Sequence, residues 1–375
     1  MENPFKFGKV VEGEDFCNRQ EEVKYLKHQI RSNHSVWLYS PRRFGKTSLL
    51  KKVYGEIEAI KTIYFDLYNI QSIDDFAKKY SKILAAELFN WKADIRRISK
   101  QLGSYFTRLY PKVSLDEQGN PTFELGLYPI HEQNDIETIL NIPEKIGLKN
   151  KQRICIAFDE FQEITRIESF LVNWMRSAFQ TQKMVSYIFL GSQQSLMQSI
   201  FADAKSPLYE FGMKMKIHPI SKRDLAEFIQ RKFEATALAI SPEHIDTILG
   251  KSECHPHFTQ YFASVVWDFI FEGSNQSNPE FTTRWINRII ESQSIVFQTI
   301  YDQLNINQKK VLKALTMSDQ EVAIFSTSTA NEYNLPASST VHEAIKSLLN
   351  KDLIYKKGKT YMLSNPVFKE WLRSL

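Results

Sequence analysis

The sequence has few cysteines and no long apolar segment. Its 375 residues include three cysteines, Cys17, Cys155 and Cys254, which are far apart and form no closely spaced pair. This spacing predicts neither a zinc site nor a disulfide framework and fits a reducing compartment. The most apolar stretch, residues 262–271, is short and includes Asp268, and the first residues carry no apolar leader. We therefore expect a cytoplasmic protein without a membrane-spanning segment.

The composition indicates a folded chain and leaves its partner open. Hydrophobic residues make up 43% of the sequence, which is sufficient for buried cores, and the length predicts two or three domains. The formal charge of +5 permits contact with a polyanion without requiring it. Charge alone therefore does not distinguish nucleic acid from protein partners.

A strand, a loop and the start of a helix follow one another after residue 35. Residues 36–39 are a short apolar run, typical of a buried parallel strand, and Pro41 favours an extended conformation at Ser40. Gly45 allows the backbone to approach an anion closely, and Gly-Lys-Thr opens a helix whose N-terminal dipole favours negative charge. The pattern predicts a phosphate-binding loop. The alternative is a solvated basic turn.

The loop side chains have distinct chemical roles in this interpretation. We expect Lys46 to reach the β- and γ-phosphates and to assist catalysis, and the Thr47 hydroxyl to bind Mg²⁺. The strict form of the pattern begins with glycine, whereas this sequence has serine at position 40. The predicted nucleotide-binding residues of the loop are Ser40, Pro41, Arg42, Arg43, Phe44, Gly45, Lys46, Thr47 and Ser48.

Two carboxylates follow a second apolar strand. Residues 153–158 form a mostly apolar run that ends in Asp159 and Glu160, and open α/β sheets bind their ligands at this end of their strands. Asp159 suits Mg²⁺, directly or through water, and Glu160 suits the general base that accepts a proton from the attacking water. A strand that ends in a solvated acidic turn is the alternative.

Polar side chains also follow the apolar strand 185–190. Ser192 and Gln193 are candidates to sense the γ-phosphate or to hold the attacking water. The alternative is a plain turn in which Ser192 caps a helix. Further strands at 62–67 and 214–217, separated by helical patterns, predict a parallel sheet.

We expect three domains. Residues 1–220 form the sheet domain, in which residues 92–150 are an elaboration with a surface hairpin. Residues 221–304 have only helical patterning and form a lid. Residues 305–375 predict three helices followed by a hairpin, which is the pattern of a winged helix.

The predicted winged helix holds most of the excess positive charge. It has ten Lys or Arg residues against six Asp or Glu residues. Its third helix contains His342 and Lys346 as cations, offset by Glu343, whereas the hairpin residues 356–359 include three lysines that can contact phosphates. Winged helices bind proteins as well as DNA, so both kinds of partner stay open.

Two further segments are candidates for contact with a nucleotide base. Residues 255–257, His-Pro-His, precede an apolar helix, and because no third ligand lies nearby, structural or nucleotide-facing histidines are favoured over a metal site. Residues 16–22 lead into a helix at 21–30. This helix either packs beside a base, with Arg19 as a contact, or simply caps the domain.

Together these features resemble the archaeal-type family of AAA-like P-loop ATPases in the signal-transducing ATPase group. The resemblance covers nearly the whole chain and implies an α/β fold with a parallel sheet in the order 5-1-4-3-2, an α-helical lid and a winged helix. It also implies ATP and Mg²⁺ as ligands and a position for Pro256 near the adenine. The matching segments are residues 16–19, 40–48, 65–68, 158–160, 190–192, 206–209, 255–256 and the winged helix.

Three functions follow from this interpretation. Glu210 and Phe211 stand where relatives usually have Gly-Arg, which, with Ser40, favours slow Mg²⁺-dependent ATP hydrolysis used as a conformational switch. The alternatives are an ATP-regulated DNA-binding protein resembling replication initiators and a nucleotide-dependent scaffold without useful hydrolysis. Arg42 and Arg43 act within one chain or across a subunit boundary, so a homo-oligomer is also open.

Overall fold

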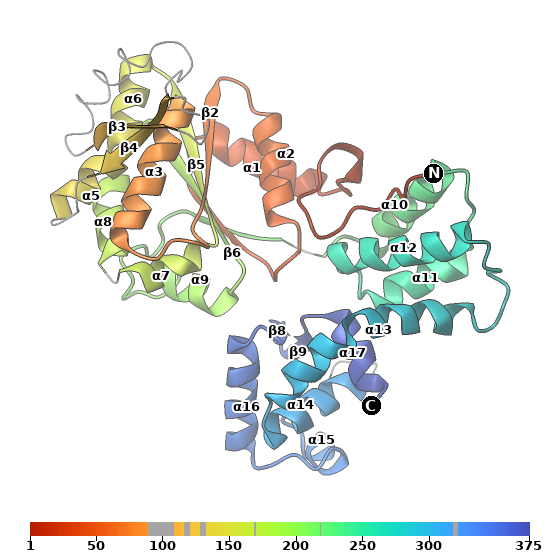
Figure 1. The fold of residues 1–375 in the computed structure, drawn as a ribbon. Helices are drawn as coiled ribbons and strands as arrows, with labels where there is room; N and C mark the ends of the chain where they lie inside the picture. The colour runs from red at the N-terminus through yellow and green to blue at the C-terminus, as the bar shows by residue number, and fades with distance from the viewer. Residues whose placement is uncertain (89–108, 116–120, 128–132, 169, 218, 318–321) are drawn as a thin grey trace. The chain divides into compact units, whose positions relative to one another are not determined.

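The computed structural model describes residues 1–88, 109–115, 121–127, 133–168, 170–217, 219–317 and 322–375 (Figure 1). They form two compact units, which we call the sheet unit and the C-terminal unit. The sheet unit comprises Gln20–Ser40 and Leu49–Ile217, and the C-terminal unit comprises Met1–Arg19, Pro41–Ser48 and His218–Leu375. No helix of the described residues is long and apolar enough to cross a membrane.

Five parallel strands form the sheet of the sheet unit. Their order is β2-β5-β6-β1-β7, and every neighbouring pair is parallel. Numbered along the chain as strands one to five, they follow the order 5-1-4-3-2 from one edge, which confirms the expected topology. Side chains of the inner strands β1 and β6 are buried throughout, as expected for strands covered on both faces. The strands are β1 (Val36–Tyr39), β2 (Ile60–Asp66), β5 (Arg153–Asp159), β6 (Val185–Gly191) and β7 (Met213–Lys216).

Helices cover both faces of this sheet, with α1 and α2 on one side and α3, α5 and α8 on the other (Figure 1). An antiparallel pair, β3 (Leu109–Leu115) and β4 (Pro121–Leu127), occupies the segment where the sequence predicts a hairpin. Its turn, at 116–120, lies outside the described residues, as do residues 92–108 and 128–132 of the elaboration predicted at 92–150. The helices are α1 (Gln20–Arg31), α2 (Lys46–Gly55), α3 (Ile73–Leu88), α5 (Gln133–Leu140), α6 (Ile142–Asn150), η2 (Phe161–Glu163), α7 (Ile164–Ile167), α8 (Leu171–Phe179) and α9 (Gln194–Phe201).

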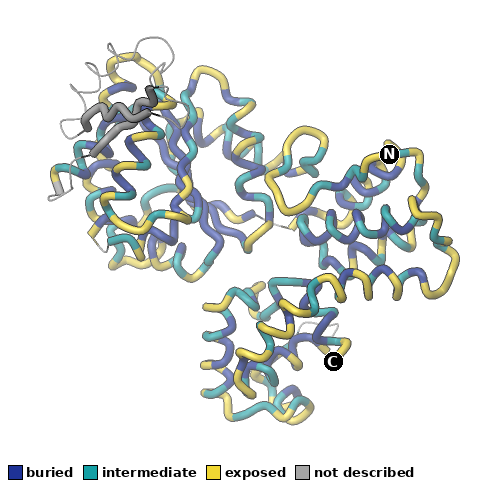
Figure 2. The backbone as a smooth tube through the Cα atoms, viewed as in Figure 1, coloured by how far each residue is buried: buried dark blue, intermediate teal, exposed yellow. Residues whose placement is uncertain are grey.

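The core of the sheet unit is aromatic and centres on Phe158, the residue before the predicted acidic pair. Its fully buried ring lies 5.7–6.2 Å, centroid to centroid, from six other aromatic rings. Figure 2 shows the strands around it as buried. Close packing of large rings leaves little freedom of position, so the carboxyl end of β5 is fixed relative to β2 and β6. The six rings are those of Phe65, Tyr80, Phe161, Phe179, Tyr187 and Phe189.

The lid helices and the winged helix share one hydrophobic core within the C-terminal unit. Phe297 of α13 packs against Phe368 and Trp371 of α17, with ring centroids 5.2 and 6.0 Å apart. Helix α17 was not predicted from the sequence, although Asn365 caps it by accepting hydrogen bonds from two backbone N–H groups. The elements are η1 (Gly13–Asp15), α10 (Lys222–Glu234), α11 (Pro242–Lys251), α12 (Pro256–Phe271), α13 (Phe281–Asp302), α14 (Ile306–Met317), α15 (Thr327–Glu332), α16 (Ser338–Asn350), β8 (Ile354–Lys357), β9 (Thr360–Leu363) and α17 (Pro366–Arg373).

Candidate functional site

The loop after β1 has two residues with a positive φ, one at a glycine and one at an arginine. Gly45 has φ +86°, a left-handed conformation that glycine adopts without a steric penalty, and α2 begins at the next residue, Lys46. Arg43 also has a positive φ of +62°, which is unfavourable for a residue with a side chain. The N–H groups at the start of α2 have no partners within the helix itself, as at any helix N-terminus, and this is the arrangement that binds phosphate.

Ser40, which replaces the first glycine of the strict pattern, fits its position without strain. It does not have a positive φ, so its backbone does not need glycine. Its N–H donates to the carbonyl oxygen of Gly191 at 3.4 Å, which continues the pairing of β1 with β6 past the end of the strand. The departure from the strict pattern therefore leaves the loop conformation intact.

The side chains of Arg19 and Lys46 donate hydrogen bonds to carbonyl oxygens of the loop. Arg19 is 5% exposed, and its Nη2 donates to the carbonyl oxygen of Phe44 at 2.9 Å. Nζ of Lys46 donates to the carbonyl oxygen of Pro41 at 3.3 Å, across the loop. Arg19 thus supports the loop backbone, whereas its predicted contact with a base stays a prediction.

Two loop arginines contact the C-terminal part of the same unit. Nη2 of Arg42 lies 3.5 Å from Oδ2 of Asp352, in the turn between α16 and β8. Nη1 of Arg43 lies 3.2 Å from Nε2 of His257 on α12. Two residues predicted to contact phosphate are therefore bound to the winged helix and to the lid.

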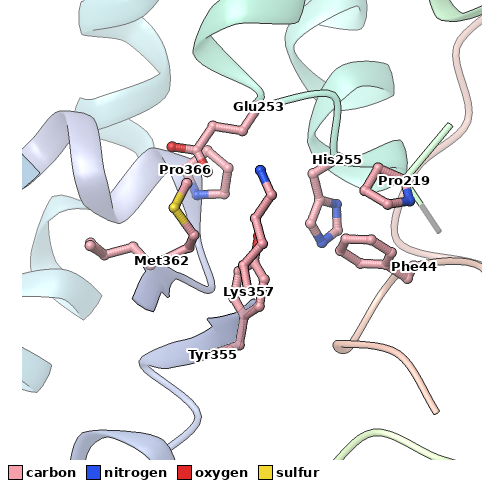
Figure 3. Close-up of a pocket in the computed structure, with 9 residues that line it drawn as sticks. Phe44, Pro219, Glu253, His255, Tyr355, Lys357, Met362 and Pro366 are labelled. Carbon is pink, nitrogen blue, oxygen red and sulfur yellow. The ribbon is translucent and has the colours of Figure 1, made fainter. Parts of the chain in front are cut away.

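Phe44 follows the two arginines in the loop and lines a cavity together with residues of the wing. It is buried, and its ring meets the ring of His255 edge-on with centroids 4.5 Å apart. Both border a cavity of about 40 Å³, which Figure 3 shows with Tyr355 and Lys357 of the wing opposite them. This volume suits a water molecule and is far too small for a nucleotide. The lining residues are Phe44, Pro219, Glu253, His255, Tyr355, Lys357, Met362, Leu363 and Pro366.

His255, which lines this cavity, and His257, two residues further along the chain, are both neutral at pH 7. Burial and then the charge of His257 lower the pKa of His255 to about 3, and burial and Arg43 lower that of His257 to about 4. Among the described residues, no group of three or more His, Cys, Asp or Glu side chains is arranged to hold a metal ion. Pro256 begins α12, and its contact with adenine stays a prediction.

At the carboxyl end of β5, two hydrogen bonds orient the buried Asp159 carboxylate. Tyr64 Oη donates to Oδ2 at 2.7 Å, and the N–H of Glu160 donates to Oδ1 at 2.9 Å. Tyr64 was not predicted from the sequence, because its role depends on the pairing of β2 with β5, which places Tyr64 opposite Ala157. A carboxylate is a ligand type that Mg²⁺ prefers, so Asp159 suits a cation, directly or through water.

Glu160 and Ser192 meet at the ends of the neighbouring strands β5 and β6. Ser192 Oγ donates to Oε2 of Glu160 at 2.7 Å, and Glu160 has a positive φ of +49°. The structure therefore brings together two of the predicted catalytic residues. Gln193 instead occupies the N-cap of α9, and its side chain does not cap that helix. Gln162, which the sequence analysis missed, hydrogen-bonds both Glu160 and Ser192.

A third carboxylate adds negative charge at this edge. Asp66 ends β2 and pairs in register with Asp159 of β5. Partial desolvation raises the pKa of Asp66, and the negative charges of Asp159 and Glu160 raise it further. The hydrogen bond that Asp66 accepts from the Tyr68 N–H lowers the pKa but does not cancel these effects. A divalent cation at this edge would relieve the repulsion between these carboxylates.

Glu210 and Phe211, where the sequence differs from the pattern expected of the family, have identifiable roles in the structure. Glu210 has a positive φ of +54°, in the left-handed region that favours glycine, the residue that the resemblance led us to expect there. Phe211, where the same resemblance implies arginine, lies beneath the guanidinium of Arg176 on α8, whose Cζ is 5.2 Å from the ring centroid. The position thus contributes to packing within the sheet unit.

Two family models match this chain, one over its larger N-terminal part and one near its C-terminus. Residues 16–254 match the family described as an ATPase domain predominantly from Archaea, and residues 295–374 match a probable winged helix domain. An uncharacterized ATP-binding protein from Methanocaldococcus jannaschii is 20% identical over 374 residues, covering 95% of this chain and 97% of that protein.

Two solved structures share the fold. The Walker-type ATPase of Pyrococcus abyssi superposes with a TM-score of 0.66 at 17% identity, covering 99% of each chain. The ORC2 protein of Aeropyrum pernix, solved with ADPNP and ADP, has a TM-score of 0.53 at 13% identity, covering 99% of this chain and 98% of that one. At sequence identities of 17% and 13%, these similarities establish the fold of this chain and nothing finer.

Proposed function

This chain belongs to the family of ATPase domains found predominantly in Archaea, and on that basis we propose that it binds ATP with Mg²⁺ and hydrolyses it slowly as a conformational switch. The observation that best supports this is the arrangement of strand ends. The pairing of β1, β5 and β6 places Ser40, Asp159 and Ser192 at one edge of the sheet. Ligands of open parallel sheets bind at this edge, and the glycine-containing loop starts there.

The loop would bind the phosphates. The N–H groups from Gly45 to Ser48 and the Lys46 ammonium are the donors, and the α2 dipole adds to their attraction for negative charge. Arg42 and Arg43 are exposed at the tip of the loop and can supply further positive charge.

The residues present fit a magnesium ion. Mg²⁺ prefers oxygen ligands and is usually bound by one or two carboxylates, with water and substrate phosphates completing its shell. Asp159 is such a carboxylate, already oriented by Tyr64, and Thr47 would supply a hydroxyl. The bound ion would neutralise charge that develops on the phosphates.

Glu160 is the proposed general base. It would accept a proton from the water that attacks the γ-phosphorus, while the bond between that phosphorus and the bridging oxygen of ADP breaks. Ser192 holds one oxygen of the Glu160 carboxylate. Lys46 would stabilise charge on the transferred group.

The contacts of Arg42, Arg43 and Phe44 suggest how nucleotide would change the winged helix. These three loop residues contact Asp352, His257 and His255, respectively. Phosphate bound by the loop would compete with Asp352 for Arg42 and shift Phe44 against the wing. ATP and ADP would then favour different contacts between the loop and the winged helix.

Phosphate release with Mg²⁺-ATP tests this proposal. We expect slow turnover by the wild-type chain and none by Glu160→Gln, which keeps the side-chain volume and should still bind ATP. Turnover by Glu160→Gln at the wild-type rate would contradict the assignment of the base. Tight binding without turnover in the wild type would favour a scaffold. A rate per chain that rises with protein concentration would indicate a site completed by a second subunit.

A second candidate is ATP-regulated DNA binding through the wing, which the exposure of Lys356, Lys357 and Lys359 favours. Against it, His342 of α16 stacks on Phe325 at 4.2 Å, which limits its reach as a recognition residue. Retention of duplex DNA that falls steeply with salt, and falls again when the three lysines are replaced by glutamate, would support this candidate. Retention insensitive to both would exclude the wing as the DNA contact.

A further inference from the structure

Gln162 contacts both polar residues at the ends of β5 and β6. Its Nε2 donates to Oε2 of Glu160 and lies 3.3 Å from Oγ of Ser192. Its Oε1 accepts the backbone N–H of Ser192 at 3.3 Å. Only 1% of Gln162 is exposed, so these contacts form away from bulk water, where hydrogen bonds hold their geometry well.

The hydrogen-bonding groups fix the orientation of the Gln162 amide. The Ser192 N–H needs an acceptor, which is Oε1, and the Glu160 carboxylate needs a donor, which is Nε2. Turning the amide over would place two donors together and two acceptors together. A glutamine therefore satisfies the backbone of β6 and the side chain of Glu160 at the same time.

Gly191 provides the space for this side chain. A Cβ added at Gly191 would lie 2.8 Å from Oε1 of Gln162 and 2.4 Å from Cγ of Met197. The last residue of β6 must therefore be small for Gln162 to lie beneath the strand end. Backbone, side chains and packing all converge on one position of the amide.

We infer that Gln162 is a positioning residue that holds the Glu160 carboxylate against Ser192 for ATP hydrolysis. Gln162 and Ser192 both donate to Oε2 of Glu160, which leaves Oε1 to accept the proton of the attacking water. This inference rests on the proposed function, because it assigns Gln162 to the base of that reaction. Gln162 itself touches neither nucleotide nor water in this role.

Two variants of this chain test the two contacts of Gln162 separately. Gln162→Met keeps a similar length but removes donor and acceptor, whereas Gln162→Glu keeps an acceptor for the Ser192 N–H and replaces the donor to Glu160. We expect kcat to fall about tenfold or more in both, while the Kd for ATP stays within about twofold of wild type. Amide hydrogen exchange at Ser192 should accelerate in Gln162→Met and stay at the wild-type rate in Gln162→Glu.

Turnover and amide exchange test different parts of the inference, so each can contradict it separately. Wild-type kcat in Gln162→Met, or a loss of kcat matched by an equal loss of ATP affinity, would overturn the positioning role. Unchanged exchange at Ser192 in Gln162→Met would overturn the contact itself. If the wild-type chain does not hydrolyse ATP, the proposed function fails and the role of Gln162 in hydrolysis fails with it, whereas exchange still decides whether the contact exists. If Gln162→Met does not fold, Ser192→Ala removes one donor to Glu160 and should lower kcat without changing the Kd for ATP.

Discussion

Arg42 and Asp352 form an ion pair, with 3.5 Å between Nη2 and Oδ2, that joins the phosphate-binding loop to the turn before the wing. Both side chains are partly exposed, at 52% and 34%, so the pair contributes little to stability. Its importance lies in what Arg42 is proposed to do. An arginine that binds a carboxylate in one state and phosphate in another links the two states by competition.

Replacing Asp352 by Asn should therefore strengthen ATP binding. Removing the carboxylate releases Arg42 for phosphate, and exposed pairs of this kind are worth up to about 1 kcal/mol, so we expect the Kd to fall by about two- to fivefold. Titration calorimetry at low salt measures this. Glu272→Gln, which breaks an exposed pair with Arg288, is the matched control and should leave the Kd unchanged. Equal effects of both variants would mean that overall charge, not the Arg42 contact, is responsible.

Removal of the Tyr64 hydroxyl should weaken the response to magnesium. Tyr64→Phe leaves the ring in place but removes the donor that orients Asp159. Loss of such a supporting hydrogen bond typically lowers metal affinity or activity by about tenfold. The Mg²⁺ concentration for half-maximal turnover measures the effect. Tyr68→Phe, at an exposed tyrosine near the same strand end, should behave as wild type, and a Tyr64→Phe response equal to that of Tyr68→Phe would contradict the role of Asp159.

Two glycine substitutions should change stability in opposite directions. In Gly191→Ala the new methyl group meets Met197 and Gln162 well inside normal contact distance, so we expect destabilisation by about 1–3 kcal/mol. Gly250 lies in α11 with open space around its Cβ position, and Gly250→Ala should stabilise by about 0.5–1 kcal/mol. Thermal unfolding checks both. A neutral Gly191→Ala would show that the neighbours of Gly191 move aside easily.

The buried His255 should make the C-terminal unit sensitive to acid. Its pKa is lowered from 6.5 to about 3 in the fold, so the unfolded chain binds more protons between these values. The stability it contributes is fully present above pH 6.5 and is lost as the pH falls toward 3. Because one pKa unit corresponds to about 1.4 kcal/mol, the loss between pH 7 and pH 5 is about 2 kcal/mol.

His255→Phe provides the test of this pH dependence. It keeps a ring against Phe44 but removes the titrating group, and the Nδ1 that it removes has no hydrogen-bond partner among the described residues. The midpoint of thermal unfolding should therefore fall less between pH 7 and pH 5 in the variant than in the wild type. Identical pH dependence of the two proteins would show that other groups determine acid sensitivity.

The sequence predicted the strands and the loop because their signals are local. Apolar runs ending in polar residues mark β1, β5 and β6, and Gly-Lys-Thr marks the start of α2 within a few residues. Asp159, Glu160 and Ser192 were each predicted from the sequence as residues of a nucleotide site at the carboxyl ends of strands. The structure places Glu160 and Ser192 in hydrogen-bond contact, while the chemical roles of all three residues stay predictions.

The missed residues depend on geometry between distant segments. Tyr64 reaches Asp159 only through the register of β2 on β5, and Gln162 reaches Ser192 across 30 positions of the sequence. The contact of Arg42 with Asp352 spans more than three hundred residues. No local periodicity contains this information. At Ser40 the sequence pattern suggested a defect that the structure does not have, because the backbone there has no positive φ and needs no glycine.

The titration of ATP into wild-type chain and Lys46→Ala, with Mg²⁺ present, tests the central claim most directly. Lys46 is 5% exposed and bridges the loop, so folding of the variant is checked first by its thermal unfolding. We predict saturable binding of one ATP per chain by the wild type, with loss of about 100-fold or more in affinity in the variant. Equal ATP affinity in a folded Lys46→Ala protein would contradict nucleotide binding at this loop.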